Sequence, residues 1–363
     1  MQRLRVLLDA GCLSDGRRAA GIGRYAQELI AALRSRDDVD IDVAQPERPP
    51  RSESRPGRFL HAQPAVLRAA ARFRPHVVHA LGGEPVLAVP SSRQVVTVHD
   101  VEMWREQPPT RLRGVALRAY GAALAGRYRA CAAVVAVSRT TAEEATRTLG
   151  LDGSRVHVVP HGVSAVFTSE PQAADDAIRS ALGLDDRYVV WSGSLRHHDP
   201  RKGLDSLLDA MSLLGPGITL ALAGAPGAES DRVATRTALM GVRTILCGQL
   251  SDARLGAVLR GARALVISSR HEGFGLPALE AMACGAPVIA TSVGNLPDLA
   301  GPAAILVPPR DSQALASSLR CLLADGGRAG DMRRAGLARA AQFSWQRAAE
   351  RVCAVYREVA RAA

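Results

Sequence analysis

Short apolar runs alternate with helical patterns along this chain, and that alternation restricts the folds open to it. Six runs typical of buried strands lie in the first half of the chain and six in the second. In chain order they are residues 5–8, 40–43, 77–80, 95–99, 134–137, 156–160, 188–191, 219–223, 243–246, 264–267, 287–290 and 304–307. Strands that alternate with helices predict parallel sheets with helices on both faces. We therefore expect an α/β protein with two Rossmann-like domains, whose ligands bind at the carboxyl ends of the strands.

A polar stretch at residues 169–176 separates the two halves and predicts a linker. A chain of 363 residues is long enough for two domains, each with its own core. Mean hydropathy is near zero, and no apolar stretch is long and uncharged enough to span a bilayer. Asp9 interrupts the first apolar run, so we expect no signal peptide. The Pro- and Arg-rich segment 45–58 predicts a mobile loop.

The segment 269–285 predicts a glycine turn that leads from a buried strand into a short helix. Pro277 suits the first helical position, where its missing N–H costs nothing, and Gly285 suits a left-handed end of the helix. Free N–H groups and the helix dipole at such a start favour an anion, for example a diphosphate. Gly273 and Gly275 allow a ligand to approach the backbone closely.

Two glutamates, Glu272 and Glu280, flank this turn. Ionised carboxylates only accept hydrogen bonds, so beside a phosphate site their natural partners are sugar hydroxyls. Two simpler interpretations remain open. Glu280 could stabilise the start of the helix by its charge, and Glu272 could be a hydrogen-bond acceptor within the loop.

Lysine is nearly absent from the chain, which has 46 Lys and Arg residues together. The single lysine is Lys202, in the sequence Asp-Pro-Arg-Lys-Gly at 199–203, between a strand-like run and a helical pattern. A glycine-containing loop at that position can cradle phosphates, and a compact ammonium serves a different purpose from a planar guanidinium. The sequence therefore predicts a second phosphate-binding loop here, although a surface lysine kept by chance is the alternative.

Five motifs together resemble the retaining glycosyltransferases of family 4. The most specific is the pair Glu272 and Glu280, separated by seven residues within EGFGLPALEAMACGAPVIA. The others are the cationic loop 194–203, GIGRYAQEL at 21–29, VHD at 98–100 and VPHGV at 159–163. The resemblance covers nearly the whole chain and implies a GT-B fold, with two Rossmann-like domains facing a central cleft. It implies an acceptor domain at 1–172, a nucleotide-sugar donor domain at 173–343, and a terminal helix at 344–363 that crosses back to the first domain.

The resemblance also implies roles for individual residues. It assigns Glu280 to the nucleotide ribose and Glu272 to the donor sugar, and brings His99 near the reacting face of that sugar. Lys202 would stabilise the leaving diphosphate together with Arg201, or with Arg196 in its place, since this loop is longer than in the family and has Ser194 where a cation is usual. The remaining donor-binding candidates are Gly21, Gly23, Gly273, Phe274, Gly275 and Leu276.

Several of these roles have structural alternatives. Gly21 and Gly23 could serve only a tight turn at a helix start, and His99 could form only a structural hydrogen bond with Asp100. Retention, which the resemblance implies, favours departure of the leaving group from the same face of the sugar that the acceptor attacks. A double displacement with Glu272 as nucleophile is the alternative. No DxD-type pair is placed to hold a metal, so we expect neither a metal nor another cofactor.

The chain is basic, with a formal net charge of +11. Aromatic residues make up 4% and no nucleic-acid-binding motif is present, so an anionic membrane surface is a better partner than nucleic acid. The helical patterns at 64–73 and 111–129 are basic and apolar enough to lie on a membrane, although a solvated arginine-rich face is the alternative. Six scattered cysteines form no ligand cluster and suit a reducing cytoplasm. We expect a cytoplasmic protein with peripheral contact at the inner membrane face.

The resemblance, together with these features, implies a retaining, metal-independent hexosyltransferase. Its donor would be a nucleotide-diphosphate sugar, with GDP-mannose the first choice. Its acceptor would be a hydroxyl of a glycan or glycolipid, such as a precursor of cell-envelope polysaccharide, while a soluble acceptor remains open. The alternatives are another GT-B enzyme, namely an epimerase or an inverting transferase, and a nucleotide-sugar-binding protein without catalysis.

Overall fold

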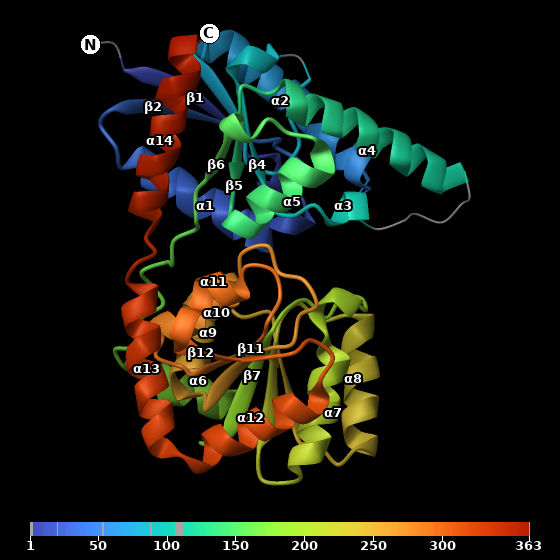
Figure 1. Cartoon of the computed structure of the whole chain (residues 1–363), viewed down its shortest axis with the longest axis vertical. Coiled ribbons are helices and arrows are strands. Elements are labelled where there is room, and N and C mark those ends of the chain that lie inside the picture. The colour runs from blue at the N-terminus through green and yellow to red at the C-terminus, as the bar shows by residue number, and fades with distance from the viewer. Residues whose placement is uncertain (1–2, 20, 53, 88, 106–111, 363) are drawn as a thin grey trace. The chain divides into compact units, whose positions relative to one another are not determined.

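The computed structural model describes residues 3–19, 21–52, 54–87, 89–105 and 112–362, which form two compact units. Unit 1 comprises residues 1–162 together with 344–363, and unit 2 comprises Val163–Phe343. Each unit has a parallel sheet with helices packed against it (Figure 1). All twelve predicted strands are present, so the predicted α/β class is confirmed.

Unit 1 contains a six-stranded sheet in the order β2-β1-β3-β4-β5-β6, and all neighbouring strands are parallel. The strands are β1 (Leu4–Asp9), β2 (Val39–Ala44), β3 (Val77–Ala80), β4 (Gln94–Val98), β5 (Ala133–Ala136) and β6 (Val156–Val158). The helices are α1 (Gly21–Arg34), α2 (Arg55–Phe73), α3 (Glu102–Arg105), α4 (Leu112–Ala130), α5 (Arg139–Leu149) and α14 (Trp345–Ala362). The strand order reverses at β1, so the loops after β1 and β3 open at one carboxyl edge.

Unit 2 repeats this plan with the order β12-β11-β10-β7-β8-β9. Its strands are β7 (Tyr188–Ser192), β8 (Thr219–Ala223), β9 (Thr244–Gly248), β10 (Ala264–Ile267), β11 (Val288–Thr291) and β12 (Ala304–Val307). Its helices are α6 (Asp175–Ala181), α7 (Leu204–Leu214), α8 (Ala228–Leu239), α9 (Asp252–Gly261), α10 (Leu276–Ala283), α11 (Leu296–Ala300), α12 (Ser312–Ala324) and α13 (Gly326–Ala340). Because β7 pairs with β10, the loops that follow these two strands are neighbours in space.

The last helix, α14, belongs to the core of unit 1. Trp345, Val352 and Tyr356 are buried there beside Tyr25 of α1. The Tyr356 hydroxyl lies 2.6 Å from Nδ1 of the buried His79, whose Nε2 lies 2.8 Å from the Thr97 hydroxyl. Burial lowers the pKa of His79 to about 3, so this ring is neutral and can both donate and accept within the chain of hydrogen bonds.

Two boundaries differ from the sequence-based expectations. Unit 2 begins at Val163 rather than at residue 173, because the intervening segment packs on unit 2: the carbonyl of Thr168 accepts a hydrogen bond from Arg260 of α9 at 3.1 Å. Residues 55–58, predicted as part of a loop, form the first turn of α2. Ser54 caps that turn by accepting from the Gly57 N–H at 3.3 Å.

Of the helix predicted at 111–129, residue 111 lies outside the described residues.

Candidate functional site

Two loops meet at the carboxyl edge of the second sheet, one after β7 and one after β10. Gly203 has φ of +59°, and a Cβ at this position would lie 1.9 Å from the carbonyl oxygen of Ser268. The Ser268 hydroxyl donates to the carbonyl of Lys202 at 3.0 Å, and the Arg270 N–H donates to the carbonyl of Arg201 at 2.6 Å. The two backbones therefore touch, and glycine is required at their junction.

This junction brings the single lysine to the first glutamate of the motif. Lys202 Nζ lies 3.0 Å from Oε2 of Glu272, and the Ser269 hydroxyl donates to the same oxygen at 3.2 Å. The charge of Glu272 raises the pKa of Lys202, so the ammonium is fully charged at neutral pH. Side-chain exposure is 36% for Lys202 and 16% for Glu272, so the pair is partly open to a ligand.

Asn295, which the motif analysis did not select, holds the glutamate loop in place. Its backbone N–H donates to the carbonyl of Glu272 at 3.1 Å, and its side-chain amide donates to the carbonyl of Phe274 at 2.9 Å. Gly294 has φ of +52°, and a Cβ there would lie 2.1 Å from the carbonyl oxygen of Glu272. The start of α11 therefore fixes the conformation of residues 272–274. The segment was visible in the sequence, but its contact with a loop 21 residues away was not.

The predicted glycine turn and helix start are present at α10. Gly275 is left-handed, with φ of +101°, and caps the helix, while Pro277 occupies the second position rather than the first. Phe274 and Leu276 are buried on either side of the cap, and Gly273 precedes them. Glu280 is 3% exposed and lies beyond the first turn of α10, which contains no acidic residue. Its position does not match the alternative of a charge at the helix start, because that effect is confined to the first turn.

The two candidate arginines of the cationic loop differ in their partners. Arg201 binds Asp199 with two parallel hydrogen bonds, Nε to Oδ1 at 2.9 Å and Nη2 to Oδ2 at 2.8 Å. Burial acts to raise the pKa of Asp199, but the hydrogen bonds and charge of Arg201 outweigh it and hold that pKa below its ordinary value. Arg196 is exposed, and its guanidinium forms no ion pair with any residue that the structure describes. Arg196 is therefore the arginine whose donors remain available to a ligand.

The other predicted residues lie in unit 1. His99 follows β4, and its Nε2 lies 2.8 Å from the carbonyl oxygen of Leu81, which can only accept, so the proton sits on Nε2. Burial lowers the pKa of His99. Gly21 begins α1, and a Cβ at Gly23 would lie 2.4 Å from the carbonyl oxygen of Arg18. Close packing of the preceding turn therefore already explains a glycine at 23.

A charged cluster at the carboxyl ends of β1 and β3 escaped the sequence analysis. Arg17 donates from Nη2 to Asp15 at 2.8 Å and from Nη1 to Glu84 at 3.3 Å. The side chains of Asp15 and Glu84 are largely buried. Asp9 ends β1 and accepts from the Gly11 N–H at 3.0 Å. Burial raises the pKa of Asp9 to about 6. The only sequence signal was an aspartate at the end of the first strand, since the partners come from separate loops.

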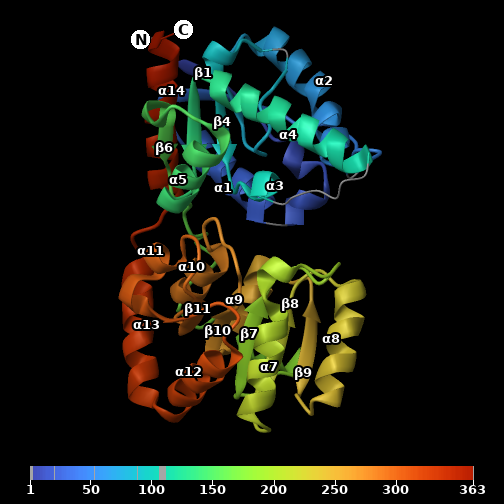
Figure 2. The same cartoon turned by 45° about the vertical axis from the view of Figure 1, so that its right-hand side comes forward.

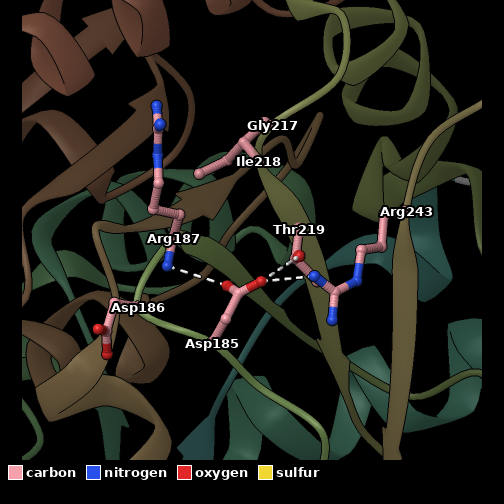
Figure 3. Close-up of a pocket in the computed structure, with 7 residues that line it drawn as sticks. All are labelled: Asp185, Asp186, Arg187, Gly217, Ile218, Thr219 and Arg243. Atoms are coloured by element: carbon pink, nitrogen blue, oxygen red, sulfur yellow. Dashed lines mark hydrogen bonds and ion pairs between the residues drawn. The ribbon is translucent and has the colours of Figure 1, made fainter.

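A cavity of about 350 Å³ in unit 2 lies at the opposite edge of the sheet, where β7 and β8 begin (Figure 3). Asp185 accepts from Arg243 at 2.5 Å and from the Arg187 N–H at 2.9 Å, so its carboxylate is already satisfied. Ligands of parallel α/β sheets bind at the carboxyl edge, so we take the junction of Lys202 and Glu272 as the candidate site.

Comparisons with known proteins bear on both units. A family model described as "Glycosyltransferase Family 4" matches residues 19–166, and one described as "Glycosyl transferases group 1" matches residues 186–325. A D-inositol 3-phosphate glycosyltransferase of Catenulispora acidiphila is 31% identical over 302 residues, which is 78% of this chain and 71% of the relative. The O-antigen chain mannosyltransferase B of Escherichia coli is 28% identical over 90% of this chain and 93% of the relative.

Other relatives match over a shorter part of their length. The chain spans about half, 56% and 52%, of the D-inositol 3-phosphate glycosyltransferases of Xylanimonas cellulosilytica and Segniliparus rotundus. Among solved structures, sucrose-phosphate synthase of Thermosynechococcus elongatus superposes with a TM-score of 0.79 at 23% identity, covering 99% of this chain and 100% of that one. At that identity the likeness concerns the fold.

Proposed function

The chain belongs to the glycosyltransferases of family 4 and has their GT-B fold, and on that premise we propose that it is a retaining hexosyltransferase. It takes a nucleotide-diphosphate sugar as donor and a hydroxyl group of a glycan or glycolipid as acceptor. The observation that carries this proposal is the ion pair of Lys202 and Glu272, where two glycine loops touch at the carboxyl edge of the second sheet. It sets a phosphate-binding cation beside an acceptor for sugar hydroxyls.

The proposed reaction breaks the bond between the anomeric carbon and the β-phosphate oxygen of the donor. The acceptor oxygen forms its bond to the anomeric carbon on the same face, and the departing phosphate takes the acceptor's proton. Negative charge grows on the diphosphate during this step, and preorganised cations stabilise it. Lys202 and Arg196 supply that charge, Arg201 orients the loop through Asp199, and the N–H groups at the start of α10 add the helix dipole.

The two carboxylates of unit 2 and His99 of unit 1 have separate proposed roles. Glu272 accepts hydrogen bonds from hydroxyls of the donor sugar, and Glu280 from the ribose. His99 presents its unprotonated Nδ1, because Nε2 is committed to Leu81, so it accepts rather than donates. We propose that no metal is needed, because Lys202 and Arg196 provide the positive charge that a metal would otherwise supply.

Mannose is the hexose we favour, with GDP-mannose as donor. The support is the likeness, over most of both chains, to a relative named as an O-antigen mannosyltransferase. For the acceptor we propose the charged cluster of unit 1, where Asp9 and Glu84 can accept from hydroxyl groups and Arg17 can donate.

Calorimetric titration of GDP, UDP, ADP and TDP without divalent metal tests the donor site. We expect one nucleotide to bind clearly and Lys202→Ala to weaken it by at least about 2 kcal/mol, as is usual for charge-assisted hydrogen bonds. Arg328→Ala, at an exposed position of α13 in the same unit, is the control and should bind like the wild type. Absence of binding, or binding that survives Lys202→Ala, would contradict the donor-site assignment. The nucleotide that binds then names the sugar donors to test for transfer.

A further inference from the structure

Helix α2 presents apolar side chains on both of its faces. Phe59, Val66 and Ala69 on the inner face are buried, and the last two pack against Leu7 of β1. On the opposite face, Leu60 is 59% exposed and Leu67 is 40% exposed. The exposed positions of this face follow helical spacing and form what we call the outer stripe: Leu60, Pro64, Leu67, Arg68 and Ala71. Isolated exposed leucines are ordinary, but an aligned stripe on a helix that is already packed inside indicates a contact.

The charged side chains that belong to helices α2 and α4 are all arginines. Helices α2 and α4 have 19 residues each, with four arginines apiece and no Asp or Glu. They adjoin through a ring contact of 6.3 Å between Phe59 and Tyr120, and both lie on the outside of unit 1 (Figure 2). Arg72 is paired with Asp42 of β2, but Arg68 and Arg118 form no ion pair within the described part of the chain.

We propose that the outer stripe of α2 docks on the surface of a bilayer that contains anionic lipid. An apolar stripe flanked by unpaired arginines is the pattern of a helix lying in a membrane interface. The arginines meet anionic headgroups, while Leu60 and Leu67 enter the boundary of the acyl chains. Within the helical pattern 64–73, the structure separates two neighbouring apolar residues, with Val66 buried and Leu67 exposed.

The inner side of α2 connects this surface to the carboxyl edge of the first sheet. A Cβ on Gly11 would lie 2.7 Å from Cβ of Ala62, so the loop after β1 packs directly on α2. Arg58 of α2 lies 3.7 Å from Asp15 in the charged cluster. A membrane on the outer stripe is thus separated from the proposed acceptor cluster by about one helix diameter, roughly 10 Å. The docking surface rests on the proposed function, which it deepens by naming where a lipid-linked acceptor is met.

Sedimentation with vesicles tests this surface directly. We expect the protein to bind vesicles of phosphatidylcholine with about a third phosphatidylglycerol at least about tenfold more tightly than phosphatidylcholine alone, and less tightly at high salt. Leu60→Asn combined with Leu67→Asn should weaken binding about tenfold or more, because both side chains lose apolar burial. Arg68→Glu should weaken binding to the anionic vesicles by about tenfold and leave the small binding to neutral vesicles unchanged.

Matched substitutions in unit 2 serve as controls. Leu213→Asn with Leu239→Asn removes two leucines that are 48% and 85% exposed, and Arg328→Glu reverses one exposed arginine. These variants should bind vesicles like the wild type, and circular dichroism should show that all variants are folded.

Three results would overturn the proposal: equal binding to neutral and anionic vesicles, no binding at all, or α2 variants that bind like the wild type. Light scattering adds a fourth, self-association in solution that the double leucine variant abolishes, since the stripe would then join two copies of the chain. Vesicle binding is measured without donor or acceptor. Its failure therefore leaves the transferase proposal standing, and failure of the nucleotide titration leaves the vesicle result standing.

Discussion

The guanidinium of Arg201 is paired with Asp199, and this ion pair is the reason that we propose Arg196 rather than Arg201 as the partner of a diphosphate. From the sequence, Arg201 was preferred and Arg196 was the alternative, and no sequence pattern indicated that Asp199 would pair with Arg201. Spacing along a loop shows which charges are near one another, but it does not show which are already neutralised. The ion pair with Asp199 shows that the charge of Arg201 is already neutralised, and this favours Arg196.

Substitution of the two arginines should separate these roles. Arg196→Ala should weaken binding of the preferred nucleoside diphosphate by about 1.5 to 3 kcal/mol, the usual value of hydrogen bonds to a charged group. Arg201→Ala should weaken it less, because its guanidinium already serves Asp199. Calorimetry with the matching nucleoside monophosphate is the control, since the effect of Arg196→Ala should shrink when the second phosphate is absent. A larger loss for Arg201→Ala than for Arg196→Ala would restore Arg201 to the diphosphate.

Asp9 gives a second prediction at this scale, on stability. Burial raises its pKa from 3.8 to about 6 in the native state, so native Asp9 binds a proton more tightly than unfolded Asp9. Its contribution to stability is therefore full below pH 3.8 and is lost as the pH rises through about 6. Above that pH the charged carboxylate costs about 3 kcal/mol by the usual conversion of pKa shifts, and Asp9→Asn should recover up to that amount.

Urea unfolding at pH 7.5 and pH 4.5 measures this effect, with the pH values chosen about 1.5 units either side of the native pKa. Asp9→Asn should be more stable than the wild type at the higher pH, and most of that gain should disappear at the lower one. Asp40→Asn, at an exposed position of β2, should show no such gain. Equal stability of Asp9→Asn and the wild type at the higher pH would mean that the native carboxylate bears its charge without cost.

At the scale of elements, the candidate site depends on three short segments that touch through glycine. The loop after β7 meets the loop after β10 at Gly203, and the start of α11 meets the glutamate loop at Gly294. The loops after β7 and β10 were recognisable in the sequence by their glycines and helix starts, whereas the start of α11 was not selected. Their contact follows from the strand order, in which β10 lies between β7 and β11, and single-sequence patterns do not reveal strand order.

Gly294→Ala should disturb this packing beyond the cost of the backbone conformation. Its Cβ would lie 2.1 Å from the carbonyl oxygen of Glu272, so the glutamate loop must move and nucleotide affinity should fall at least about tenfold, the loss of one charge-assisted contact. Gly241→Ala is the matched control, because its φ of +65° is similar but no atom lies within 4 Å. It should cost only about 1 to 2 kcal/mol of stability for the left-handed conformation. Nucleotide affinity after Gly241→Ala should stay that of the wild type in the same titration, and an equal loss of affinity in both variants would contradict the packing argument.

At the scale of the whole chain, the alternation of strands and helices was enough to predict both sheets and all twelve strands. The predicted domain boundary was displaced by ten residues, because the segment 163–172 is polar like a linker yet is tied to α9 by Arg260. The charged cluster of Asp9, Asp15, Arg17 and Glu84 was missed, since its members are unremarkable in their own segments. Local pattern specifies elements well, whereas clusters assembled from distant loops require the fold.

The rarity of lysine has a further consequence at this scale. A protease specific for lysine can cut this chain at one peptide bond, between Lys202 and Gly203, giving fragments 1–202 and 203–363. That bond lies where Lys202 is paired with Glu272 and the Gly203 backbone rests on Ser268, so the loop must open before a protease can accommodate it. The rate of this one cleavage therefore reports how often the cationic loop 194–203 opens. A nucleotide that binds Lys202, as we propose, should slow the cleavage, and no label on the protein is needed to measure it.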